Sequence, residues 1–204
     1  MTRSPVIPDD ETVAPFVGIP APDFQGLKDN APAGTNVQLL TGDQATLKAW
    51  NNALADPNAA GVFFIGHAAS TNPDATPFVD NSGINLANGT FNPKGGVDVK
   101  AQTVGIFACD SQDSQKLFKM KDGQALIGMS SGADGLTSTS GLSQAGYAAA
   151  KEIVNARGPD AAVAAANGAL TNASKAMTVR APNGQNVDLR ANPMNVGDRV
   201  VRIH

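Results

Sequence analysis

The stretch that decides the fold is GVFFIGHAAS at residues 61–70, together with TVGIFACDSQDS at residues 103–114. Each begins with a short run of β-branched and aromatic residues, which is typical of a strand buried on both faces. A Gly-His pair ending at His67 follows the first run, and an Ala-Cys pair ending at Cys109 follows the second. The pattern therefore predicts two central strands, each followed by one small residue and then by a residue with a reactive side chain.

The rest of the chain alternates short apolar runs with helical patterns. Residues 125–129 (ALIGM) predict a third central strand, and Ala-rich helices are expected at residues 140–156 and 159–174, the second with a proline in its first turn. Short buried strands alternating with helices indicate an α/β fold, with a mostly parallel sheet flanked by helices. A tail hairpin through residues 177–179 and 187–189 is expected to add antiparallel pairing at one edge of this sheet.

Smaller elements connect these. The sequence predicts a short strand at residues 36–40, a helix from Thr41 or Asp43 to about Ala55, and a short helix at residues 114–120. It also predicts a small hairpin through residues 77–79 and 84–86, a turn at Asn88-Gly89, and a last strand at residues 199–203.

Prolines divide the chain into an arm and a domain. Six of the thirteen prolines fall within residues 1–34, too many for a regular element, because each removes a hydrogen-bond donor and fixes φ. Residues 1–34 are therefore predicted to form an extended arm, and residues 35–204 a single α/β domain whose residues 176–204 form a β-hairpin and strand extension. The arm is a flexible tail, a strap across the domain that occludes the cleft, or a pro-segment that is removed by self-processing.

Composition excludes several classes of function. The net charge of -3 comes without a basic block, which argues against a nucleic-acid partner, and the apolar runs are too short to span a membrane. One cysteine cannot form an intramolecular disulfide, and with two histidines it cannot build a structural zinc site. Calcium on Asp side chains stays open, although no twelve-residue calcium-binding loop is present, and no metal site or cofactor is predicted. The chain shows no apolar signal segment, which predicts a cytoplasmic protein or one delivered by a non-classical secretion route.

His67 and Cys109 together suggest a catalytic dyad. In an open α/β sheet, residues just past the carboxyl ends of parallel strands line the ligand crevice, so adjacent strands would place imidazole and thiol side by side. An imidazolium lowers the pKa of a thiol, and the thiolate then attacks a carbonyl carbon while the histidine acts as general acid and base. Taken singly, each residue is also compatible with a structural role, as a small buried cysteine or a hydrogen-bonded histidine.

The same stretches resemble a known family. An apolar strand before His67, then a hairpin-like segment at residues 77–99, then an apolar strand before Cys109 are similar to the core of caspase-like cysteine peptidases, nearest to the CHAT type. Downstream, QALIGMSSG at residues 124–132 is similar to the next strand of that family, and residues 146–170 resemble its paired closing helices. The resemblance covers about residues 36–175.

The resemblance implies a caspase-haemoglobinase fold and hydrolysis of peptide bonds in a protein or peptide substrate. It implies that Cys109 is the nucleophile and His67 the general acid and base. The backbone of Cys109 and of the Gly66 to Ala68 turn would then supply the N–H donors that stabilise the oxyanion.

The chain departs from the family at three places. The family usually has glycine directly after the catalytic histidine, and here it is Ala68, which enters the left-handed backbone region less easily. The Gln-Ala-Cys-Arg-Gly stretch of caspases is absent, and Phe107 occupies the place of the aspartate that metacaspases have two residues before the cysteine. Two alternatives therefore remain open: a protease-inactive domain that binds partners, and an acyl-transfer or deamidating enzyme that uses the same dyad.

The substrate pocket has only weak candidates. In this family the pocket for the residue before the scissile bond tends to follow the third strand, where Ser130, Ser131 and Asp134 stand. The carboxylates of Asp110, Asp113 and Asp134 offer partners for a Lys or Arg side chain of a substrate. The Gly-rich residues 130–141 lack the Gly-Lys-Ser/Thr ending of a phosphate-binding loop, so phosphate binding is not expected.

Overall fold

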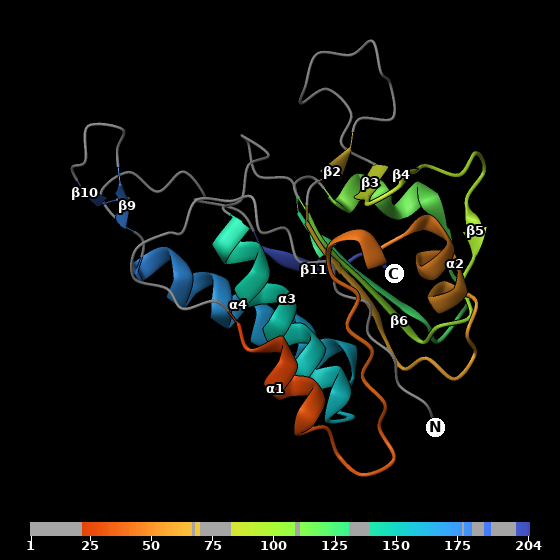
Figure 1. The fold of residues 1–204 in the computed structure, drawn as a ribbon, viewed down its shortest axis with the longest axis horizontal. Coiled ribbons are helices and arrows are strands. Elements are labelled where there is room, and N and C mark those ends of the chain that lie inside the picture. The colour runs from red at the N-terminus through yellow and green to blue at the C-terminus, as the bar shows by residue number, and fades with distance from the viewer. Residues whose placement is uncertain are drawn as a thin grey trace.

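The fold is seen in a computed structural model of the 204-residue chain (Figure 1). The described part of the chain comprises residues 22–66, 68–69, 83–108, 111–130, 139–176, 178–180, 186–188 and 199–204.

A sheet with the order β1-β6-β8-β11 forms the centre of the molecule. β1 (Val62–Ile65), β6 (Thr103–Phe107) and β8 (Ala125–Met129) are parallel, and β11 (Val200–Arg202) runs antiparallel to β8 at one edge. The three strands predicted as buried are all present, and every residue of β1, β6 and β8 is buried. The predicted α/β class with a mostly parallel sheet is thus confirmed.

Helices cover both faces of this sheet. α3 (Thr139–Val154) and α4 (Gly158–Ala176) lie on one face, and α2 (Leu47–Leu54) lies on the other (Figure 1). Because successive strand residues point to opposite faces, each strand supplies both cores. Val62, Phe64, Val104, Ile106 and Leu126 join the core on the α2 side, whereas Phe63, Ile65, Phe107, Ile127 and Met129 join the core under α3 and α4.

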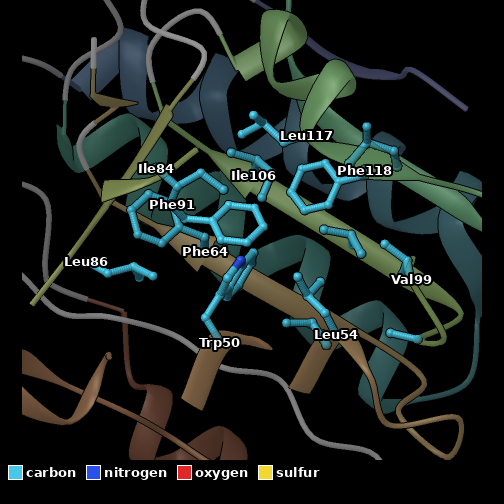
Figure 2. Close-up of a cluster of buried hydrophobic side chains, with 14 of the residues drawn as sticks. Trp50, Leu54, Phe64, Ile84, Leu86, Phe91, Val99, Ile106, Leu117 and Phe118 are labelled. Carbon is cyan, nitrogen blue, oxygen red and sulfur yellow. The ribbon is translucent and has the colours of Figure 1, made fainter. Parts of the chain in front are cut away.

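Aromatic side chains fill the core on the α2 side (Figure 2). The fully buried ring of Trp50 packs edge-on against Phe64 and Phe91, with ring centroids 6.2 and 6.1 Å apart. Phe91 also stacks on Phe118 at 5.8 Å. Among the described residues, the indole N–H of Trp50 has no hydrogen-bond acceptor, so apolar packing alone holds this ring in the core.

Small residues let α3 approach the opposite face closely. Gly146 of α3 lies against the side chains of Ile65 and Phe107, and a Cβ atom built on it would be 2.4 Å from Ile65 Cδ1 and 3.3 Å from Phe107 Cδ2. The buried alanines of α3, such as Ala145 and Ala149, belong to the same core. The Ala-rich composition of α3 therefore reflects close helix–sheet packing.

A second, small sheet follows β1. β2 (Ala68–Ala69) pairs with β3 (Gly83–Leu86), which pairs with β4 (Gly89–Phe91). The turn between β3 and β4 is tied to α2, because Asn88 Oδ1 accepts the N–H of Leu47 at 2.8 Å. The predicted strand at residues 84–86 and the turn at Asn88-Gly89 are confirmed, while residues 77–79 lie outside the described part of the chain.

The arm prediction was wrong for residues 24–29. These residues form α1 (Phe24–Asp29), capped by the Asp23 side chain, which accepts the N–H of Gly26 at 2.7 Å. Leu27 is buried in the core under α3, and Phe24 packs edge-on against Tyr147 at 5.3 Å. The described prolines of this region, Pro22 and Pro32, flank the helix, so neither interrupts its hydrogen bonds.

Three smaller predictions were also wrong. Residues 36–40 form no strand, although Val37 is buried. α2 begins at Leu47, because the Thr46 hydroxyl caps it by accepting the N–H of Ala49, and a 3₁₀ turn, η1 (Gly42–Gln44), precedes it. In place of a helix at residues 114–120, the chain forms a 3₁₀ segment, η2 (Ser111–Leu117), and then β7 (Phe118–Lys119), which pairs with β5 (Val97–Asp98).

The tail pairs differently from the prediction. β9 (Thr178–Arg180) and β10 (Asn186–Asp188) form the expected hairpin, but they make a separate two-stranded sheet. β11 instead supplies the antiparallel edge of the main sheet. The amide of Asn167 on α4 then covers the outer side of β11, since it accepts the N–H of Val200 and donates to its carbonyl, both at 2.8 Å. A side chain thus replaces the next strand at this edge.

Candidate active site

The two strands that precede His67 and Cys109 end side by side. β1 pairs in parallel with β6 up to Ile65 and Phe107, and the N–H of Gly66 then donates to the carbonyl of Phe107 at 3.1 Å. The sequence predicted both strands, and their adjacency, which it left as a condition for the dyad, is met. His67 and Cys109 themselves lie outside the described residues.

The other strands of the main sheet reach the same edge. β8 ends there and leads into Ser130, and the antiparallel β11 begins there, directly after Arg199. Arg199 is exposed, and its backbone is fastened to Ser130. The carboxyl edge of the parallel strands is where an open α/β sheet binds its ligands, and the described residues at this edge are Gly66, Ala108, Ser130 and Arg199.

Ser130 has a structural partner. Its N–H and its hydroxyl donate to the Arg199 carbonyl at 2.8 and 3.0 Å, and the hydroxyl accepts the N–H of Arg199 at 3.3 Å. These bonds connect the start of β11 to the end of β8. They also use the Ser130 hydroxyl, which was predicted to face a substrate. Of the other pocket candidates, Asp113 is exposed on η2, and Ser131, Asp134 and Asp110 lie outside the described residues.

The structure corrects the predicted role of Gly66. The Gly66 N–H is used by the Phe107 carbonyl, so it is not available to an oxyanion. The position instead needs glycine for packing, because a Cβ atom there would be 2.8 Å from the ring of Phe64. The oxyanion role predicted for the backbone of Cys109 and Ala68 stays a prediction.

Ala68 is not in the strained conformation that its place after His67 suggested. It lies in β2 and pairs with Ile84 of β3, and Ala156 is the one described non-glycine residue with a positive φ. The chain after His67 therefore enters an extended strand that alanine adopts as readily as other residues. The substitution of alanine for glycine at this point brings no left-handed strain.

Sequence reasoning missed Ser111 at this edge. It is 1% exposed, and its hydroxyl bonds to the backbones of both β6 and β8. A serine in a polar loop after a strand is common, so the only signal in the sequence was its place two residues after Cys109. A buried role for this hydroxyl becomes visible only when β8 is placed beside β6.

The described residues contain no group of three or more His, Cys, Asp or Glu side chains that could hold a metal ion. No helix in the described part of the chain is long and apolar enough to cross a membrane. No protein-family model, curated protein or solved structure matches this chain.

Proposed function

We propose that the protein is a caspase-like cysteine peptidase that hydrolyses peptide bonds with Cys109 as nucleophile and His67 as general acid and base. One observation carries the proposal: β1 and β6 are neighbouring parallel strands in register, and they end together at Gly66 and Ala108. His67 and Cys109 each come one residue later.

Chain connectivity limits how far apart the two reactive residues can be. Neighbouring strands lie about 4.8 Å apart, and consecutive Cα atoms are about 3.8 Å apart. Since Gly66 still pairs with β6, His67 and Cys109 both leave from the same short section of the sheet edge. Imidazole and thiol are thus expected within hydrogen-bond reach, which is what a Cys–His dyad requires.

The first half of the reaction forms an acyl-enzyme. The Cys109 thiolate attacks the carbonyl carbon of the substrate, a C–S bond forms, and the carbonyl electron pair moves to oxygen, where backbone N–H groups stabilise the negative charge. The intermediate then collapses and breaks the C–N bond. The amine takes a proton from the His67 imidazolium and leaves, and a thioester remains on Cys109.

The second half releases the acid. Neutral His67 takes a proton from water, and the resulting hydroxide attacks the thioester carbon. Collapse breaks the C–S bond and regenerates the thiolate and imidazolium, and the acyl part of the substrate leaves as a carboxylic acid, which loses its proton to solvent. Beside this edge, the extended β2 gives the chain after His67 a fixed direction, supported by β3, whose turn is tied to α2.

The described geometry bears on the inactive alternative. That alternative drew on Ala68 in place of glycine, and Ala68 is extended in β2, so the substitution gives no reason for a damaged site. Acyl transfer and side-chain deamidation use the same nucleophile and the same oxyanion donors. Product mass separates them from hydrolysis.

The test is digestion of a proteome-derived peptide library, with products read by mass spectrometry. The proposal expects that the wild-type protein alone yields pairs of product peptides. The summed mass of each pair should exceed the mass of the parent peptide by one water. Cys109→Ala and His67→Ala should both abolish the products, while Asp122→Asn, which changes an exposed carboxylate in the turn before β8, at the opposite end of that strand, serves as the matched control. Joined peptides or a lost amide without chain cleavage would support the other enzymes. No product in any library, with an ordinary thiol, would refute the proposal.

A further inference from the structure

A buried serine hydroxyl joins β6, the strand that precedes Cys109 in the chain, to the neighbouring strand β8. The Ser111 hydroxyl donates to the carbonyl of Ile106 in β6 and accepts the N–H of Met129 in β8, both at 2.7 Å. Ser111 is 1% exposed, so water does not compete for either bond. These two bonds use both the donor and an acceptor site of the hydroxyl.

This hydroxyl lies where the pairing of the sheet changes. β6 pairs with β8 up to Ile106 and Gly128, but it pairs with β1 one residue further, through Phe107. At Phe107 the chain therefore no longer pairs with β8, although it still pairs with β1. Ser111 returns to this point and bonds to a carbonyl five residues earlier.

The opposite strand provides room for this contact. A Cβ atom on Gly128 of β8 would be 2.7 Å from Ile203 Cδ1, 3.1 Å from Ser111 Oγ and 3.4 Å from the Ser111 carbonyl oxygen. Ordinary contacts to a Cβ atom are longer than the first two of these distances, so a larger residue at position 128 would press on Ile203 Cδ1 and on the Ser111 hydroxyl. Glycine at position 128 therefore leaves room for Ser111 and its two hydrogen bonds to Ile106 and Met129, which together we call the serine clamp.

We infer that Ser111 is the positioning residue of the nucleophile, an inference that rests on the proposed function. Phe107 is fixed by its pairing with Ile65, and Ser111 is fixed by its two hydrogen bonds, so only three residues, with Cys109 in the middle, connect the two anchors. A segment this short has few conformations once both ends are held. The clamp thereby sets the direction from which the thiol meets His67.

The experiment compares Ser111→Ala with Ser114→Ala. Ser114 is the other serine of η2 that is 1% exposed, so its loss matches the structural cost of removing a buried hydroxyl from the same segment. For each variant, the rate of Cys109 alkylation by iodoacetamide is measured across pH, together with the free energy of unfolding in urea. Amide hydrogen exchange at Met129 reports directly on the clamp.

Ser111→Ala should raise the apparent pKa of the Cys109 thiol toward its ordinary value of about 8.5 and slow alkylation near pH 6 by about tenfold to a hundredfold. Exchange at Met129 should accelerate, and Ser114→Ala should leave both readouts as in the wild type. Ser111→Thr, which keeps the hydroxyl, should restore the thiol pKa in part. If Ser111→Ala does not fold, Gly128→Ala, made together with Ile203→Val to remove the Ile203 Cδ1 atom that the new Cβ would also meet, presses on the hydroxyl and should raise the thiol pKa in the same direction.

The outcomes separate the two proposals. A wild-type thiol with an ordinary pKa would refute the dyad itself, whatever Ser111 does. A wild-type thiol with a lowered pKa that is equally low in Ser111→Ala and in Gly128→Ala made together with Ile203→Val would refute the positioning role and leave the dyad intact. Equal shifts in Ser111→Ala and Ser114→Ala would show a general effect of destabilising η2, which also overturns the inference.

Discussion

Two glycines in the long helices should respond with opposite sign to the same substitution. Gly168 of α4 is exposed, and a Cβ atom built on it meets no other atom within 4 Å. Gly168→Ala should therefore stabilise the protein by about 0.8–1 kcal/mol, which is the difference in helix propensity between the two residues. Gly146 of α3 gains the same propensity, but its Cβ atom would be 2.4 Å from Ile65 Cδ1.

Overpacking of this kind costs about 1–3 kcal/mol, so Gly146→Ala should destabilise the protein by up to about 2 kcal/mol. Urea unfolding measures both variants, and thermal unfolding should separate them, because 1 kcal/mol shifts the midpoint of a chain this long by about 2–4 °C. Ile65→Val removes the crowded Cδ1 atom. Alone it should cost about 0.5–1.5 kcal/mol, and in the Gly146→Ala background it should cost less or become stabilising.

Two results would contradict the close packing of Gly146 against Ile65. If Gly146→Ala stabilised as much as Gly168→Ala, α3 would not pack on β1 as closely as the structure shows. If Gly146→Ala and Ile65→Val were simply additive, the crowding would involve other atoms. Either result would also question the placement of Ile65, which lies two residues before His67.

Three further changes test other contacts. Ala156 follows α3 with a φ of 59°, so Ala156→Gly should stabilise by about 1 kcal/mol in urea unfolding, and no gain would contradict that conformation. Asn88→Ala removes the acceptor for the N–H of Leu47 and should cost about 1 kcal/mol, with faster amide exchange at Leu47 as a check. Asn167→Leu should cost about 2 kcal/mol and expose the edge at Val200, and an unchanged midpoint in thermal unfolding would refute the edge-covering role.

The central strands could be predicted from the sequence because their signal is local. β6 and β8 have the predicted bounds, and β1 starts one residue after the predicted start, since a strand buried on both faces is a continuous apolar run bounded by polar residues. The end of α3 near Ala156 was also predicted from local residues. Two of these strands, β1 and β6, end side by side just before His67 and Cys109 in the chain, which is why the candidate site could be proposed from sequence.

Other features depend on partners distant in the chain. The start of α2 was misplaced because Thr41, Asp43 and Thr46 are equally good caps in isolation, and Thr46 is favoured where Asn88 takes up the N–H of Leu47. α1 is held by Leu27 and Phe24 against α3, more than a hundred residues away.

The same explanation holds for two side chains that bond to the sheet from η2 and α4. Ser111 and Asn167 bond to backbone groups of strands that the sequence does not place beside them. Nothing in the local pattern distinguishes them from polar surface residues. Their roles could be found only after β8 and β11 had been placed.

The most direct measurement is the alkylation rate of Cys109 against pH in wild type and in His67→Ala. Cys109 is the one cysteine of the chain, so the modified mass reports on it alone. The proposed dyad predicts a wild-type thiol that reacts well below pH 8 and a His67→Ala variant slowed at low pH, because the imidazolium no longer stabilises the thiolate. A wild-type thiol that reacts only above pH 8, with the same profile in His67→Ala, would contradict the dyad and with it the proposed peptidase.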